Sequence, residues 1–133
     1  VERLGELRKH LAHLRALQPR VRGAEDLRRD LSLHNDVLFS LLTVCQLVID
    51  IASELSTRRG LKIDDYTEAV RNLGAYKEFP PEILETLSRL PGFRNVVVHE
   101  YVNLDLDRAV EALRHLDPVE KFMRLVAEIE GRA

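Results

Sequence analysis

The sequence predicts an all-α fold, an up-and-down bundle of about five helices. Apolar residues recur at intervals of three and four along most of the chain, which is the period of an amphipathic helix. Alternating β-branched runs are few, and no Asn-Gly or Asp-Gly pair marks a hairpin. Proline and glycine fall mainly between the periodic segments, where they end helices.

The first helix is expected at about residues 2–17 and the second, the longest, at about residues 24–57. A heptad seam runs along the second helix and is interrupted only by His34; it consists of Leu27, Leu31, Leu38, Leu41, Cys45, Val48, Ala52 and Leu55. Further apolar residues widen this seam. Such a helix lies at the centre of a bundle or also meets a second subunit.

The remaining helices are shorter. Asp64 or Asp65 can cap a helix that ends near Gly74, and Asn103 or Asp105 can cap the last one, which Asp117-Pro118 interrupts. Between them, Pro80-Pro81 starts a helix that Pro91-Gly92 should kink or break, so that residues 93–100 form a separate helical segment.

Length and composition predict a single domain over residues 1–133. No apolar run approaches the ~20 residues that span a bilayer, and the charged segment 1–15 is unlike a signal peptide. Cys45 is alone, so we expect no intrachain disulfide and a cytoplasmic protein that does not bind membranes. A net charge of -2 and the absence of tryptophan argue against a broad duplex-binding surface, but they leave room for a small basic cleft.

One short run carries groups suited to phosphate chemistry. Arg94 can bind phosphate oxygens, His99 can move a proton near neutral pH, and Tyr101 adds a hydroxyl. Asn95 shares a helix face with His99, whereas Arg94 lies about 140° from it on an ideal helix. Arg94 and His99 can therefore meet at one phosphate through the reach of the arginine, through fraying near His99, or across a dimer axis.

These residues also allow plainer interpretations. An isolated Arg and His at this spacing can be a surface arginine and a histidine bonded to a backbone carbonyl. Asp50, within an apolar stretch, could orient His99 or pair with Arg94. It could equally be solvated or make an unrelated capping contact.

The segment Leu90–Tyr101, L-P-G-F-R-N-V-V-V-H-E-Y, resembles the signature of HEPN-domain proteins of the HepT type. In that signature an Arg, usually followed by Asn, precedes a His by four intervening residues, and a Tyr follows after one more. The resemblance extends to V-I-D-I-A at Val48–Ala52 and to D-D-Y-T-E-A-V at Asp64–Val70. It covers most of the chain from about residue 30 onward.

The resemblance implies a homodimeric ribonuclease toxin of a type VII-like toxin–antitoxin system that cleaves RNA without a metal ion or cofactor. Carried over, Arg94 and His99 are catalytic, Asn95 matches the polar residue that often follows the Arg, and Tyr101 accepts AMP from ATP. We expect Asn95 and, from its place in the apolar stretch, Asp50 to support the catalytic pair. The implied partners are RNA and an MntA-type nucleotidyltransferase that silences the toxin, with a larger toxin–antitoxin assembly as an option beyond the dimer.

These residue types suit metal-free RNA cleavage, which needs a base for the 2′-hydroxyl, an acid for the leaving 5′-oxygen and a cation for the phosphate. One chain offers one motif His, so a two-fold dimer would supply both acid and base. Two alternatives remain at this point. One is a non-cleaving HEPN module that binds nucleotide or the transferase, and the other is a helical dimer in which the motif only packs.

Overall fold

The computed structural model describes residues 2–132, which are largely helical and contain no strand. The all-α class is therefore confirmed, but the described residues form eight α-helices rather than about five: α1 (Glu2–Leu17), α2 (Ala24–Arg29), α3 (Leu31–Arg58), α4 (Tyr66–Arg71), α5 (Pro81–Leu87), α6 (Leu90–His99), α7 (Leu106–Arg114) and α8 (Asp117–Arg132). Short 3₁₀ segments, among them Tyr101–Asn103 directly after α6, complete the helical part of the chain.

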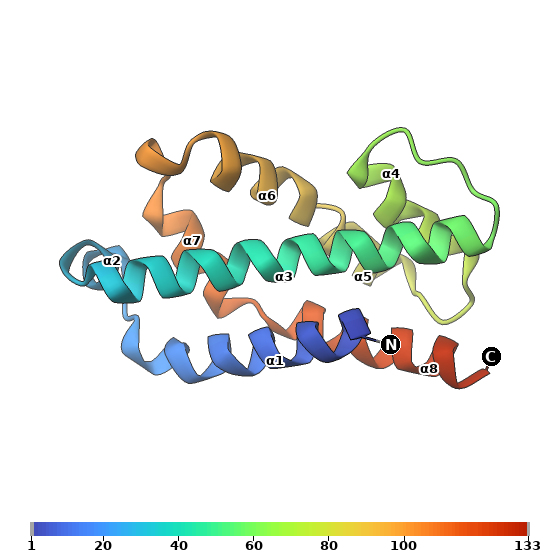
Figure 1. Cartoon of the computed structure of the whole chain (residues 1–133), viewed down its shortest axis with the longest axis horizontal. Helices are drawn as coiled ribbons and strands as arrows, with labels where there is room; N and C mark the ends of the chain where they lie inside the picture. Colours follow the sequence, from blue (N-terminus) through green and yellow to red (C-terminus); the bar gives the residue numbers. More distant parts are fainter. Residues whose placement is uncertain (1, 133) are drawn as a thin grey trace.

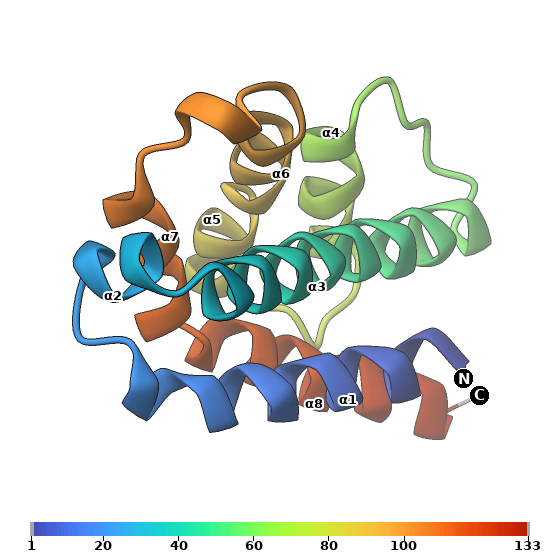
Figure 2. The ribbon, with the colours of Figure 1, turned by 60° about the vertical axis from the view of Figure 1, so that its left-hand side comes forward.

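Helix α3 is the centre of the molecule (Figure 1). In Figure 1, α1 and α8 lie below it, and α6 and α4 lie above it. Figure 2, which turns the view, keeps α1 beside α8 on one side of α3 and α6 with α4 on the other. The bundle therefore has two sides, and α6, which carries the Arg94–His99 pair, lies on the side away from α1.

Leucines recur every three or four residues along α1, and these leucines and the seam of α3 are buried against each other and their neighbours. Leu7 and Leu14 are fully buried in α1, and the seam of α3 from Leu38 to Leu55 is buried as well. Leu31 is the exception, because 71% of its surface is exposed.

The exposure of Leu31 follows from a break in the helix that was expected over residues 24–57. Asp30 has an extended backbone between α2 and α3, and its carboxylate accepts a hydrogen bond from the Leu33 amide at 3.1 Å. This is an N-cap, so α3 begins at Leu31 and α2 is a separate short helix. The seam residue Leu27 consequently belongs to α2.

The expected break at Pro91-Gly92 is wrong in position. The chain breaks at Ser88 and Arg89, and Pro91 lies buried in the first turn of α6. Proline is accepted there because the first amides of a helix have no partner within the helix. The motif from Arg94 to His99 therefore lies on one continuous helix of ten residues.

Of the alternative caps, the structure uses Asp65 for α4 and Asp105 for α7, each accepting a backbone amide at 2.8 and 2.9 Å respectively. Pro118 lies in the first turn of α8 instead of interrupting a longer helix. The breaks at Asp30, Ser88 and Leu116 thus account for the helices beyond the expected number.

Helix α3 is long and apolar enough to cross a membrane by length and composition, although its apolar residues form no single uninterrupted run. Its most apolar stretch has a mean hydropathy of 1.7, and 56% of that stretch is buried within the bundle. Burial of this kind is what a core helix requires.

Candidate functional site

Helix α6 lies antiparallel on α3 and is fastened to it by polar contacts at two places. Near its middle, the Arg94 Nε donates a hydrogen bond to the Gln46 side-chain oxygen at 3.0 Å. Just beyond its end, the Tyr101 hydroxyl donates to the Asn35 side-chain oxygen at 3.0 Å. Between these two contacts, Val97 is buried and packs the helix against the core.

The guanidinium of Arg94 is held on several sides. Besides the bond to Gln46, one Nη1 hydrogen is donated to the Asn95 side-chain oxygen at 3.0 Å. The ring of Tyr66, from the start of α4, lies 5.5 Å from the centre of the guanidinium, within the range of a cation–π contact. Arg94 is thus half-buried and oriented, while its Nη2 group has no hydrogen-bond partner within residues 2–132.

Asp50 is linked to Arg94 through Gln46. The Gln46 Nε2 donates to the Asp50 carboxylate at 2.9 Å, while the oxygen of the same amide accepts from Arg94. These two bonds fix which end of the amide faces the arginine. Asp50 therefore reaches Arg94 by way of Gln46, and within residues 2–132 its carboxylate hydrogen-bonds neither His99 nor Arg94 directly.

His99 is the last residue of α6 and is exposed. Because α6 is a regular helix from Leu90 to His99, the five residues from Arg94 to His99 turn about 140° around its axis. Asn95, one turn before His99, is also exposed. Within one chain the structure therefore brings Asn95 near the face of His99, and it holds Arg94 on a different face.

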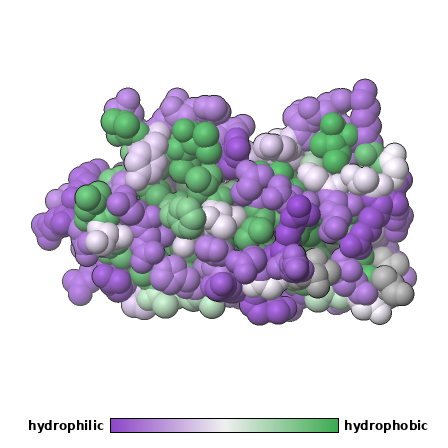
Figure 3. All heavy atoms as spheres, viewed as in Figure 1, coloured by the Kyte–Doolittle hydropathy of each residue, from purple (hydrophilic) through white to green (hydrophobic). Residues whose placement is uncertain are grey.

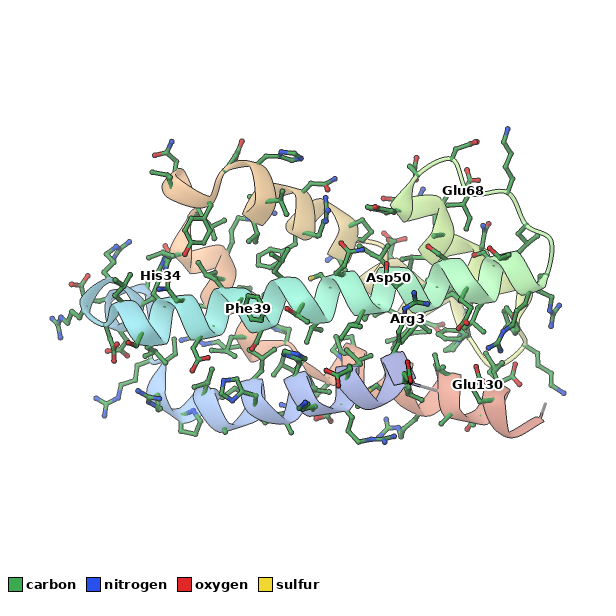
Figure 4. All side chains as sticks on the ribbon, in the orientation of Figure 1. Arg3, His34, Phe39, Asp50, Glu68 and Glu130 are labelled. Atoms are coloured by element: carbon green, nitrogen blue, oxygen red, sulfur yellow. The ribbon has the colours of Figure 1, made fainter. Side chains whose placement is uncertain are left out.

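Tyr101 lies over the first turns of α3 and not beside Arg94. Its hydroxyl bonds to Asn35, and its ring meets the His34 ring edge-on at 5.8 Å between centroids. In Figure 4, His34 lies toward one end of α3 and Asp50 in its other half, with Phe39 between them. The two clusters around α6 are therefore separated along α3.

A hydrophobic groove joins the two clusters. A cavity of about 450 Å³ is lined by Asn35, Leu38, Phe39, Leu42, Val97, Val98 and Tyr101, and a second of about 290 Å³ extends to Gln46 and Arg94. Phe39 is 65% exposed and Val98 43%, although both are apolar. Figure 3 shows hydrophobic atoms gathered over α6 and the first half of α3 on this face.

Three residues of this site escaped the sequence analysis: Asn35, Gln46 and Tyr66. Asn35 and Gln46 sit on the long helix among apolar residues, and Tyr66 lies in the D-D-Y-T-E-A-V segment. The available signal was their place on α3 and in the D-D-Y-T-E-A-V segment. Nothing in the sequence pairs them with Arg94 or Tyr101, because those contacts join residues 28 to 66 positions apart.

Comparison with known proteins agrees with the all-α fold. The bundle, in which α6 carries Arg-Asn-x3-His and Tyr101 follows in the next turn, has the fold of HEPN toxins. A family model described as "Ribonuclease HepT-like" matches residues 7–126, and the chain belongs to this HepT-like family.

Individual relatives and solved structures are consistent with that family. The mRNA nuclease HepT of Shewanella oneidensis is 29% identical over 101 residues, which cover 74% of this chain and 76% of that protein. A relative from Archaeoglobus fulgidus is 36% identical over 92 residues, or 68% of this chain and 69% of that protein. The tri-AMPylated HEPN toxin of Shewanella oneidensis, solved in complex with MNT antitoxin, superposes with a TM-score of 0.81 at 21% identity and covers 96% of this chain and 95% of its own.

Proposed function

We propose that this chain is a ribonuclease toxin of a type VII-like toxin–antitoxin system and that Arg94 and His99 carry out its RNA cleavage. The observation that carries the proposal is an arginine, held by Gln46 and Asn95, on the same helix as an exposed histidine; the Nη2 group of the arginine has no hydrogen-bond partner among residues 2–132. Membership of a family of HepT-like ribonucleases supports the reaction class.

In the proposed reaction, the 2′-hydroxyl of the RNA attacks the neighbouring phosphorus and the 5′-oxygen leaves. Arg94 stabilises the negative charge that gathers on the phosphate oxygens, and one His99 acts as base or acid. The step is metal-independent, because two histidines and two arginines supply proton transfer and charge without a metal ion. Asn95 and, through Gln46, Asp50 hold Arg94 in place.

The proposal includes a homodimer. Arg94 and His99 point about 140° apart on α6, so one chain does not place both at one phosphate without a large movement. The groove between α3 and α6 exposes Phe39 and Val98, of which Val98 also lines the cavity that reaches Arg94, and a second copy would cover this apolar surface. A two-fold axis there would pair the Arg94 of one chain with the His99 of its partner.

Tyr101 is the proposed acceptor of AMP from an MntA-type nucleotidyltransferase, by analogy with the AMPylated HEPN toxin that resembles this chain. Tyr101 is 46% exposed in the single chain, so an enzyme can reach its hydroxyl in a protomer whose groove is not covered by a second copy. Added AMP places bulk and negative charge next to His99, where RNA phosphate would bind. We place both proteins in the cytoplasm.

The nuclease assignment is tested with purified protein and RNA in the presence of a chelator. Wild type should cleave, and His99→Ala should lower the rate by about 10²–10⁴-fold, the usual contribution of a general acid or base. His115→Ala is the matched control, because His115 is also an exposed histidine, located at the end of α7. Cleavage that survives in His99→Ala, or that needs added metal, would contradict the assignment.

The acceptor assignment is tested by the mass of the protein after incubation with ATP and the transferase. We expect AMP-sized additions on wild type and none on Tyr101→Phe, with Tyr66→Phe as the control because Tyr66 is similarly exposed. If wild type gains AMP but never cuts RNA, the chain is instead a non-cleaving HEPN module that binds nucleotide and transferase.

A further inference from the structure

Among residues 2–132, the side chain of Tyr101 links the turn after α6 to α3 by a hydrogen bond and a ring contact. Residues 100–103 are all exposed, and the chain returns to the core only at Leu104. The side chain of Val102 is 91% exposed. Tyr101 is the residue of this turn whose side chain contacts α3, and the catalytic candidate His99 lies two positions before it.

The contact point on α3 is the side chain of Asn35. Its oxygen accepts from the Tyr101 hydroxyl at 3.0 Å and also faces the Nδ1 of His34 at 3.1 Å. The His34 and Tyr101 rings pack nearly at right angles to each other, so His34 and Asn35 together contact the tyrosine side chain. Asn35 itself lies in the second turn of the 28-residue helix α3, so the contact with Tyr101 is anchored on a long helix.

We propose that Asn35 is a positioning residue for RNA cleavage: it holds the Tyr101 hydroxyl, and thereby fixes the end of α6 that presents His99. This positioning role for Asn35 rests on the proposed nuclease function. A histidine at an unsupported helix end samples many orientations, because the last turn of a helix frays. The bond to Asn35 restricts that motion and keeps the imidazole near one place.

The same bond gives the modification of Tyr101 a second effect. In AMP transfer, the tyrosine oxygen bonds to the α-phosphorus of ATP, the bond from that phosphorus to pyrophosphate breaks, and pyrophosphate leaves with the electron pair. The phenolic proton passes to solvent. The modified oxygen carries no hydrogen and cannot donate to the Asn35 oxygen, which is itself an acceptor. AMP transfer therefore releases the turn from α3 as well as adding bulk and charge.

Three single variants separate the hydrogen bond from the bulk of AMP. Tyr101→Phe removes the donor and keeps the ring, Asn35→Leu removes the acceptor at similar size, and Asn35→Asp keeps an acceptor. We expect kcat for RNA cleavage to fall about three- to tenfold in the first two, as expected for the loss of one hydrogen bond, with KM little changed. Asn35→Asp should cleave within about twofold of wild type, and the Asn35→Leu/Tyr101→Phe double variant should fall no further than either single one.

Amide hydrogen exchange provides a readout that needs no nuclease activity. In Tyr101→Phe and Asn35→Leu, the amides of residues 99–103 should exchange about three- to tenfold faster than in wild type, while those of α1 and α8 are unchanged. Exchange and kcat equal to wild type in both variants would overturn the proposal, as would additive losses in the double variant. A wild type that does not cut RNA refutes the proposed function instead, and the exchange result then still decides whether Asn35 holds the turn.

Discussion

At the scale of single residues, the amide side chain of Gln46 connects Asp50 to Arg94. Replacing it by leucine removes the acceptor of the Arg94 Nε and leaves Asp50 without its donor. Hydrogen bonds to charged groups contribute about 1.5–3 kcal/mol, so Gln46→Leu should lower kcat/KM for RNA about ten- to hundredfold. The measurement is cleavage of a labelled RNA in chelator.

The control for Gln46→Leu is Thr43→Val. Thr43 lines the same cavity as Arg94, but its hydroxyl bonds to the backbone of its own helix at Phe39. Thr43→Val should retain wild-type cleavage. Equal losses of cleavage in both variants would mean that any change to the lining of this cavity disturbs the site, and that Gln46 has no particular role.

Cys45 gives a prediction about reactivity. Burial raises the pKa of its thiol to about 12, so the thiol stays protonated at pH 8. Since the thiolate is the nucleophile, native protein should not react with iodoacetamide at this pH, and guanidinium-unfolded protein should react fully. Intact mass spectrometry measures both. Rapid alkylation of the native protein would show that α3 opens easily at its centre.

At the scale of elements, the end of α3 depends on a contact from the segment after α4. The buried hydroxyl of Tyr76 donates to the Leu55 carbonyl at 2.7 Å. Tyr76→Phe should lower the free energy of unfolding by about 1–3 kcal/mol, because a buried carbonyl loses its partner. Urea denaturation followed by circular dichroism measures this loss. Tyr66→Phe, at an exposed ring, should change it by less than about 0.5 kcal/mol, and equal changes in both variants would refute the assignment.

The elements also show what the sequence can and cannot predict. The seam from Leu38 to Leu55 was predicted correctly because periodicity reports directly which face of a helix is buried. The break at Asp30 was missed because apolar residues on both sides of it continue the same period, so only the capping aspartate marked it. Pro91 was assigned to a break because a proline tolerated in a first turn looks, in sequence, like one that stops a helix.

For the site as well, the sequence predicts some of the residues and not others. Arg94, His99 and Tyr101 stand close together in the sequence, so a motif can reveal them. Asn35 and Gln46, which accept hydrogen bonds from Tyr101 and Arg94, come from α3. Whether these bonds form depends on how far α6 is shifted along α3. Hydrophobic periodicity determines the facing sides of two helices but not that shift.

At the scale of the whole molecule, the groove between α3 and α6 predicts self-association. Phe39→Glu places a charge on the exposed apolar surface, so the proposed dimer should become a monomer and lose RNA cleavage. Light scattering after size-exclusion chromatography measures the mass. Leu31→Glu is the control, because Leu31 is equally exposed on the same helix but does not line the groove. A dimeric Phe39→Glu variant would place the interface elsewhere.

The two hydrogen bonds that attach α6 and the turn after it to α3, at Gln46 and Asn35, depend on the length of α3 between these two residues. Asn35 and Gln46 are eleven residues apart, which is almost a whole number of turns, about three, so both project from one side of α3 some 16 Å apart. One residue inserted between them would rotate one attachment by about 100° relative to the other. The geometry of α6 sets the separation of Arg94 and His99, but the length of α3 decides whether the contacts at Gln46 and Asn35 can form together. A change in the length of α3 between these two residues would therefore disturb the site without changing any residue of the motif from Arg94 to Tyr101.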